Sequence, residues 1–224
     1  MNLAEMVQEL DLIVADPSLK PYYVNWLNQA IEEIALDIDL PTLKRKNPFY
    51  LSTSATEWVW PLPETFHKKL FRCLDKDGNQ VTICRTVDDL IDLDPDHDET
   101  GDRVTHVAVD ETGPSKYLYT YPKADDTLAL WFYEKPRRLQ YDDDVPNLMP
   151  PEFHGRVIIP KVVVKNFRLL QDMASDSPHQ SLIYWEEQYR KGLYGEPRGE
   201  IGLINYLARA KGGPRRHGGR DPLP

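Results

Sequence analysis

The stretch KYLYTYPKADDTLALWFYEKP, residues 116–136, decides the fold class of this chain. Its first part, residues 116–122, alternates tyrosine with other residues, and its second part, residues 127–136, is rich in aliphatic and aromatic side chains. Both parts are bounded by Pro or Asp, and short runs with such boundaries are typical of β-strands. The stretch therefore predicts two consecutive strands.

Four more runs of this kind lie upstream of it. Six short runs spaced by roughly ten residues predict an antiparallel β-domain, either a small sandwich or a barrel. The upstream runs are TEWVWPLP (56–63), FHKKLFRCL (66–74), QVTICRT (80–86) and VTHVAVD (104–110).

Helical periodicity begins upstream of the strands. The first 14 residues have apolar side chains spaced by three and four, with Asn2 placed to cap a helix and Glu5 three residues later. A second helix is predicted from Tyr23 to Ile38, because the same spacing returns there and Pro41 ends it.

Helical periodicity also returns downstream of the strands. Residues 149–173 contain β-branched runs, but their flanks favour a helix with Pro151 at its first position and a start or kink at Pro160. A fourth helix is predicted with Ser177 as its cap, Pro178 at its first position and Gly195 as its end.

Together these patterns predict an α+β fold, in which a four-helix bundle carries an inserted antiparallel β-domain and ends in an extended C-terminal tail. We expect the N-terminal helices in residues 1–46, the β-domain in 47–149, the C-terminal helices in 150–195 and the tail in 196–224.

Composition and charge narrow the class of protein. The 224 residues are 41% hydrophobic, enough for a globular core, and carry a net charge of −9. Residues 209–224 contain five basic side chains against Asp221 alone, a charge of +4 that leaves −13 for the rest. The first ten residues lack the basic start of a signal peptide and no apolar run is long enough to cross a bilayer, so we expect no membrane partner and synthesis in the cytoplasm.

The two cysteines, Cys73 and Cys84, flank a turn predicted at Asp77–Gly78. A four-residue loop would place the thiols opposite each other, whereas a two-residue loop would pair Cys73 with Thr82. We expect two reduced, half-buried thiols.

Sequence signatures of common active sites are absent. The chain contains no phosphate-binding loop, dinucleotide fingerprint, GxSxG nucleophile motif or CxxC pair, and its six histidines are scattered singly. The chain is therefore expected not to be an enzyme, and no cofactor or catalytic residue is assigned.

The acidic run VDDLIDLDPDHDETGDR, residues 87–103, is the remaining candidate for a metal site. Asp92, Asp94, Asp96 and Asp98 alternate as calcium ligands do, but a calcium loop starting at Asp92 would have His97 in place of its glycine and Arg103 in place of its bidentate glutamate. We therefore interpret the run as a solvated loop or as a lining that repels phosphate. One alternative function is a metal-assisted hydrolase that uses the carboxylates of Asp92–Asp102, with His97 or His106 carrying a proton.

The predicted strands also suggest a second alternative. Alternation places Tyr117, Tyr119 and Tyr121 on one face, where they are expected to be core or interface residues. If Tyr117, Tyr119 and Trp131 were exposed, they could instead form a glycan-binding platform.

The order of these elements resembles the head-to-tail adaptor (connector) proteins of tailed bacteriophages. The resemblance runs in order from Met1 to Leu193. It is carried by the segments WLNQAIEEIA, WVWPLPETFHKKLFRC, DDLIDLDPDHDETGDRVTHVAVD, YLYTYPKADDTLALWFYEKP, MPPEFHGRVIIPKVV and YWEEQYRKGL.

The resemblance implies a structural protein of the virion. Such proteins form a ring, usually of twelve copies, that docks beneath the portal at one capsid vertex and receives tail or nozzle proteins, while DNA passes through the centre without sequence recognition. In that family the helices form the ring body near the portal, the β-domain faces tail proteins, and the C-terminal segment reaches the portal.

The C-terminal segment has a composition that suits such a contact. An apolar patch within residues 201–207 precedes a Gly- and Pro-rich basic tail that cannot build a core of its own. We expect this segment to bind the portal or a neighbouring subunit. The predicted contact residues are Ile201, Leu203, Ile204, Tyr206, Leu207, Arg209, Lys211, Arg215 and Arg216.

Overall fold

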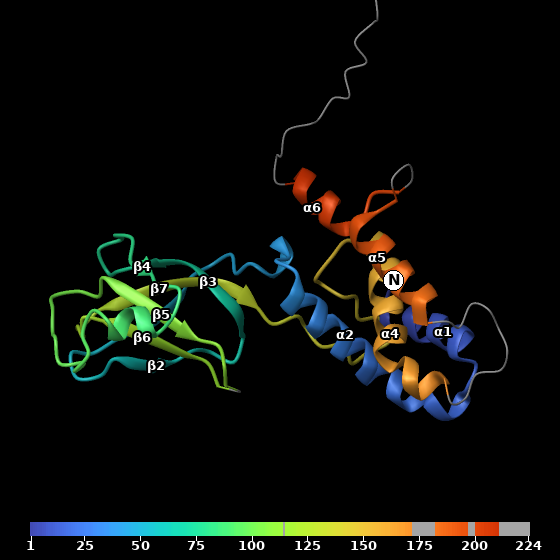
Figure 1. The fold of residues 1–224 in the computed structure, drawn as a ribbon, viewed down its shortest axis with the longest axis horizontal. Helices are drawn as coiled ribbons and strands as arrows, with labels where there is room; N and C mark the ends of the chain where they lie inside the picture. The colour runs from blue at the N-terminus through green and yellow to red at the C-terminus, as the bar shows by residue number, and fades with distance from the viewer. Residues whose placement is uncertain (114, 172–181, 197–199, 211–224) are drawn as a thin grey trace, which may run out of the picture. The chain divides into compact units, whose positions relative to one another are not determined.

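The computed structural model describes residues 1–113, 115–171, 182–196 and 200–210. The chain divides into two compact units. The helical unit contains residues 1–42 and the chain from residue 136 onward, and the β unit contains residues 43–135. The predicted α+β class is confirmed, since helices and antiparallel and mixed sheets are both present (Figure 1).

The two N-terminal helices form where periodicity predicts them. Helix α1 spans Leu3–Val14, and the capping box is present: the Asn2 carboxamide oxygen accepts the Glu5 N–H and the Glu5 carboxylate accepts the Asn2 N–H, each at 2.9 Å. A 3₁₀ turn, η1 (Pro17–Tyr22), leads into α2 (Tyr23–Asp37). The buried faces of both helices are the apolar stripes predicted from the sequence.

The predicted third helix is built from three pieces around Pro160. A 3₁₀ turn, η3 (Pro151–Phe153), begins with Pro151, a π-helical turn, η4 (His154–Ile158), follows, and α4 spans Ile159–Gln171. Pro160 has no N–H to donate to the Arg156 carbonyl one turn earlier, and the wider π-helical turn precedes it there. The sequence prediction of a start or kink at Pro160 is confirmed.

Helix α5 (Leu182–Tyr194) crosses the π-helical turn at close range. A Cβ atom built on Gly192 would lie 2.0 Å from the Arg156 carbonyl oxygen, so only glycine fits at this crossing. Gly195 ends α5 with a positive φ of 84°, as predicted. The predicted cap, Ser177, and first helical residue, Pro178, lie outside the described residues.

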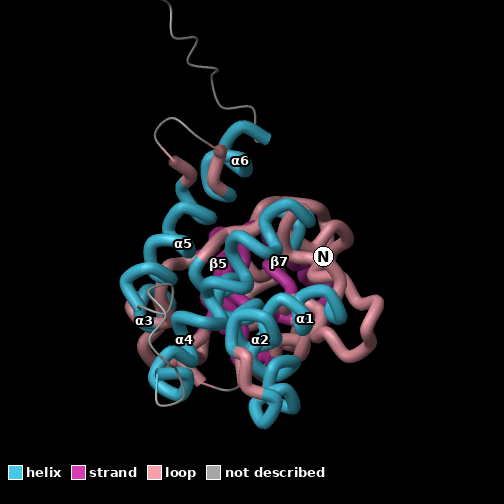
Figure 2. Tube along the Cα trace, turned by 90° about the vertical axis from the view of Figure 1, so that its right-hand side faces the viewer, coloured by secondary structure: helices cyan, strands magenta, loops and turns pink. Residues whose placement is uncertain are grey.

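Helix α6 (Leu203–Ala210) lies beyond the C-terminal end of α5, whereas α1, α2, α4 and α5 pack side by side (Figures 1 and 2). The helical unit therefore contains α6 in addition to the four predicted helical segments, in a part of the chain that was predicted to be an extended tail.

The segment from residue 136 to residue 149 belongs to the helical unit, although the sequence placed it in the β-domain. Leu139 and Leu148 are buried, and the side chain of Asn28 in α2 accepts the Leu139 N–H at 2.8 Å and donates to the Leu139 carbonyl at 3.0 Å. The segment has no regular secondary structure, which is why periodicity assigned it to the neighbouring strands.

The strands that the structure describes form two sheets in the β unit. The three-stranded sheet has the order β1-β7-β3 and is antiparallel, and the four-stranded sheet has the order β2-β6-β5-β4. The strands are β1 (Phe49–Ser52), β2 (Val59–Pro61), β3 (Phe66–Leu74), β4 (Thr82–Ile83), β5 (His106–Asp110), β6 (Tyr117–Tyr121) and β7 (Thr127–Glu134).

Three features of these sheets differ from the sequence prediction. The six predicted runs each contain a strand, but β1 was not predicted, and β4 pairs with β5 in parallel rather than antiparallel. Both predicted hairpin registers are wrong, because Cys73 lies opposite neither Cys84 nor Thr82. The Val81 N–H donates to the Cys73 carbonyl at 3.0 Å, and the Cys84 N–H donates to the Val107 carbonyl at 2.7 Å. The turn at Asp77–Gly78 is tight, and the chain then leaves β3 to join the other sheet.

Both sheets contribute to one apolar core. On β7 the side chains of Leu128, Leu130 and Phe132 are fully buried, and on β6 Leu118 faces them from the other sheet. The outward faces of the two sheets therefore carry the alternate residues of the same strands.

Candidate interaction surfaces

The predicted contact patch at residues 201–207 folds partly onto its own chain. Leu203 is fully buried, and the Tyr206 ring packs edge-on against Phe153 with ring centroids 5.3 Å apart. Leu203 is therefore not available to a partner, because its side chain already belongs to the core of the helical unit.

Two glycines let α6 approach the end of α5. A Cβ atom on Gly202 would lie 2.1 Å from the Gly195 nitrogen, and Gly195 pairs with Ile201 in an antiparallel bridge. The Asn205 side chain donates to the Tyr194 carbonyl at 2.7 Å. The N-terminal end of α6 is therefore fixed by backbone contacts within one subunit.

The remaining apolar residues of this junction stay accessible. Tyr194 is 56% exposed, Ile201 39% and Tyr206 38%, and we call these three residues the α5–α6 surface. Ile204 and Leu207 are half-buried and Arg209 is exposed, whereas Lys211, Arg215 and Arg216 lie outside the described residues.

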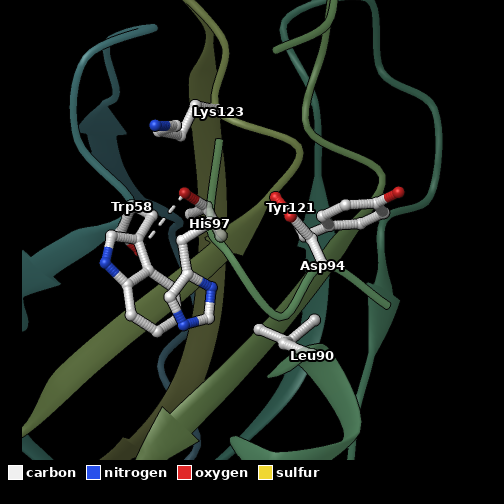
Figure 3. A pocket seen from close by; sticks show the side chains of 7 residues that line it. Trp58, Leu90, Asp94, His97, Tyr121 and Lys123 are labelled. Atoms are coloured by element: carbon white, nitrogen blue, oxygen red, sulfur yellow. Dashed lines mark hydrogen bonds between the residues drawn. The ribbon is translucent and has the colours of Figure 1, made fainter. Parts of the chain in front are cut away.

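The acidic run, residues 87–103, forms an ordered segment on the outward face of the four-stranded sheet. It contains the short helix α3 (Asp88–Ile91), which contacts β5 and β6. The His97 ring stacks on Trp58 with centroids 3.5 Å apart (Figure 3). The Tyr121 hydroxyl donates to the Glu99 carboxylate at 2.7 Å. That hydrogen bond, together with burial and the negative charge of Glu99, raises the pKa of Tyr121.

The carboxylates of the acidic segment do not converge on a common centre. Asp89 accepts the Thr86 N–H and Asp94 accepts the Glu99 N–H, so these two carboxylates close turns in the chain. Within the part of the chain that the structure describes, no three His, Cys, Asp or Glu side chains are grouped as metal ligands. The small pocket beside Trp58 and His97 holds one carboxylate, Asp94 (Figure 3).

The aromatic residues of the glycan alternative lie on two different sheets. Tyr117 and Tyr119 are on β6 in the four-stranded sheet, and Trp131 is on β7 in the three-stranded sheet. The three tyrosines of β6 share one face, as predicted, and this face points away from the core. Trp58 packs edge-on against Tyr119 there, with ring centroids 4.9 Å apart. The structure does not bring the proposed glycan residues into one platform.

A different surface on the three-stranded sheet was missed by the sequence reasoning. Its outward face combines aromatic rings with cations: Lys44 lies 4.8 Å from the Phe71 ring centroid, and the Arg72 guanidinium lies 4.8 Å from that of Trp131. In the sequence of β7, Trp131 and Tyr133 alternate with the core residues. This alternation could have predicted a second, aromatic face on this strand. We call this surface the cationic face, made of Lys44, Tyr50, Phe71, Arg72 and Trp131; the Tyr133 ring beside Lys44 is buried.

The thiols are poor candidates for chemistry. Cys73 is fully buried, and burial together with the nearby carboxylates of Asp126 and Asp75 raises its pKa to about 12. Burial also raises the pKa of the half-buried Cys84, and both thiols are reduced. Both side chains therefore act as small apolar residues at neutral pH.

The sequence matches the family described as SU10 adaptor protein over residues 1–206. The chain belongs to the SU10 adaptor protein family. The match covers the β unit entirely and the helical unit as far as α6. The expected kinship with phage head-to-tail adaptors is therefore confirmed, and the chain belongs to a family of structural phage adaptors.

Among curated proteins no match is found. No helix within the described ranges is both long enough and apolar enough to span a bilayer.

Proposed function

We propose that the protein is a ring-forming head-to-tail adaptor that docks beneath the portal, receives tail or nozzle proteins and lets DNA pass through its centre. The observation that carries this proposal is the family match over residues 1–206, which includes both units rather than one motif. Such a ring, usually of twelve copies in proteins of this kind, would form at the portal vertex of the virion. Each copy would make the same contact with the next copy, and the last copy would close the ring.

The two units suit different partners in this proposal. The helical unit forms the ring body on the portal side, and the β unit faces the tail proteins. Without the basic C-terminal residues the chain carries a charge of −13, so a channel lined by the body would repel the DNA backbone and let it slide.

The C-terminal segment provides the contact with the portal or with a neighbouring subunit. The α5–α6 surface supplies accessible apolar side chains, and Arg209 follows them directly. Because the start of α6 is fixed by Gly195 and Gly202, the end of this helix at Ala210 has a defined place in the helical unit. The basic residues Lys211, Arg215 and Arg216 would then meet acidic groups on the partner.

The test is the mass of complexes in solution, measured by light scattering. The full chain is measured alone and with purified portal rings, with and without a divalent-cation chelator. We expect one large complex that forms only with the portal and is unchanged by the chelator. Failure to bind any portal would overturn the proposal, and loss of the fold on chelation would favour the metal-assisted hydrolase.

Two truncations separate the parts of the C-terminal segment. A chain that ends at Ala210 lacks the basic tail, and a chain that ends at Gly195 also lacks α6. We expect portal affinity to fall in the first and to be lost in the second. A double variant, Ile201→Glu with Tyr194→Ala, leaves Leu203 and the contact between Tyr206 and Phe153 in place, so weak binding by this variant reports on the surface rather than on folding. Unchanged binding by all three chains would exclude this segment as the anchor.

A further inference from the structure

The β unit presents opposite charges on its two outward faces. The cationic face lies on the three-stranded sheet, and the acidic segment covers the four-stranded sheet, with the shared apolar core between them. A surface on one side of a unit that complements a surface on its other side is the arrangement that joins identical copies head to tail.

The cations of the cationic face are held in position by aromatic rings. Arg72 pairs with Trp131 across the β3–β7 ladder, and its guanidinium lies over the indole ring. Lys44 lies near two rings, 4.8 Å from the centroid of Phe71 and 5.6 Å from that of Tyr133. Cation–π contact leaves the N–H groups of these side chains able to bind a carboxylate.

Exposed aromatic area accompanies these charges. Tyr50 is 66% exposed beside Ala129 of β7, and Phe71 is 38% exposed on β3. Aromatic side chains and arginine are enriched in protein interfaces, because they bury much area at little cost in conformational entropy. The cationic face thus has the chemistry of an interface rather than of a solvated surface.

The acidic segment is rigid enough to be the complementary partner. It is held at both sides of its tip by the His97–Trp58 stack and by the Tyr121–Glu99 hydrogen bond. The exposed carboxylates of Asp96 and Asp98 flank His97, whose φ of 52° turns the chain there. An ordered loop that already holds its charges loses little entropy when it docks.

We propose that the acidic segment of one copy docks on the cationic face of the next copy, with Asp96 and Asp98 paired against Lys44 and Arg72. The inference rests on the proposed ring and names a contact that would close it. A repeated contact of this kind is heterologous, and it forms a ring when the rotation between copies closes.

A second copy fits the cationic face better than nucleic acid does. A groove for single-stranded nucleic acid needs many cations along the backbone, and two phosphate contacts give little affinity at physiological salt. The net charge of −9 adds repulsion against phosphate. The acidic segment, in contrast, is present in every copy at the same concentration as its partner surface.

The test uses charge reversal in the full chain. The face variant carries Lys44→Glu and Arg72→Glu, and the segment variant carries Asp96→Lys and Asp98→Lys. Asp89, Asp94 and Glu99 are left intact, because they hold the acidic segment together. Circular dichroism confirms that each variant is folded, and the neutral pair Lys44→Gln and Arg72→Gln replaces the face variant if it is not.

Self-association is measured by sedimentation equilibrium over a wide range of protein concentration. We expect the wild-type chain to associate, and each variant alone to associate at least about tenfold more weakly. An equimolar mixture of the two variants should associate again, because the native charges attract each other in one contact and the reversed charges attract each other in the other. A control with Arg138→Glu and Arg190→Glu, two exposed cations of the helical unit, should behave like the wild type.

Several results would overturn the inference. The wild-type chain could stay monomeric at the highest concentration, or the variants could associate as strongly as the wild type does. A mixture of the two variants that does not regain self-association would contradict the inference as well. Binding of a single-stranded oligonucleotide that only the face variant loses would assign the face to nucleic acid instead. If the variants still form the large portal-dependent complex, the adaptor function stands and this contact is wrong. If no portal is bound but the mixture recovers association, the contact stands and the portal role is wrong.

Discussion

Backbone segments approach each other closely in both the helical unit and the β unit, but different residues make this approach possible. In the helical unit, backbones meet where a side chain is missing: Gly192 lies against the Arg156 carbonyl, and Gly202 lies against Gly195. In the β unit, loops meet where a buried carboxylate accepts several N–H groups, as Asp126 and Asp75 do. Helix contacts therefore depend on shape, whereas the loop contacts of the sheets depend on hydrogen bonds and charge.

The largest expected effect tests the dependence on shape. Gly192→Ala places a Cβ atom 2.0 Å from backbone that cannot move alone, so we expect the stability of the helical unit to fall by about 3 kcal/mol. Urea unfolding followed by circular dichroism at 222 nm measures it. Gly155→Ala is the matched control, because its Cβ would meet only flexible side chains of Met1 and Glu9. Equal effects of the two substitutions would contradict the comparison.

The next effect tests the dependence on hydrogen bonds. Asp126 is 5% exposed and accepts the N–H groups of Lys76 at 3.0 Å, Thr127 at 2.7 Å and Val104 at 3.0 Å. In Asp126→Asn one of these N–H groups faces an amide donor, so we expect the β unit to lose about 2 kcal/mol of stability.

Neighbouring Asp125 is the control for this substitution. Its side chain is exposed and, among the contacts described, accepts only the Ala55 N–H, at 3.0 Å. Asp125→Asn should cost about 0.5 kcal/mol. Urea unfolding followed by tryptophan fluorescence compares the two, and an equal loss would show that burial of the carboxylate does not matter.

Acidification should destabilise the helical unit at a higher pH than the β unit. Burial lowers the pKa of His154, although the carbonyls of Met1 and Met149 near its ring nitrogens favour the charged form. The folded helical unit therefore holds neutral imidazole, and its stability is full above pH 6.5 and falls as the pH drops below that value.

The β unit should respond at lower pH. Burial opposes the charge of Asp75, but the Asn79 side chain, the N–H groups of Asn79 and Asp77, and Arg103 outweigh it and lower the pKa of this carboxyl. Its contribution is present above pH 3.8 and is lost as the pH falls through the lower folded pKa. Hydrogen exchange at pH 7, 5.5 and 3 measures both units, and His154→Gln should remove the loss of protection that the helical unit shows at pH 5.5. A β unit that opens first would reverse this expectation.

The smallest expected effect concerns the acidic segment. His97 is stacked on Trp58 and has a φ of 52°, which is unfavourable for a residue with a Cβ atom. His97→Ala loses the stack and keeps the strain, so we expect about 1 kcal/mol of destabilisation. His97→Gly also loses the stack but relieves the strain, and it should be more stable than the alanine variant by about 1 kcal/mol. Thermal unfolding measures the difference, and the opposite order would show that the turn is unstrained.

Sequence reasoning succeeded where the structure depends on local spacing. The stripes of α1 and α2, the cap at Asn2 and the interruption at Pro160 each follow from residues within one or two turns. The existence of six strands followed from equally local patterns.

Sequence reasoning failed where the partner of a segment is distant in the chain. Strand β4 pairs in parallel with β5, and the contacts of Cys73 and Cys84 follow from that pairing rather than from the length of the turn between them. The cationic face draws on residues from Lys44 to Trp131, so no single window of sequence contains it. The burial of Leu203 depends on glycines that precede it, which a scan for apolar patches does not weigh.

The parallel pairing of β4 with β5 has a consequence for how freely this protein can vary. Parallel neighbours cannot be joined by a tight turn, so the chain needs a long crossover between them. Here that crossover runs from Cys84 to Thr105 and contains the acidic segment. Residues with exposed side chains at its tip can be exchanged, and a foreign peptide could be inserted there, without disturbing either strand. A deletion that shortens the crossover would instead pull β4 away from β5, so this segment tolerates changes in composition and additions but not loss of length.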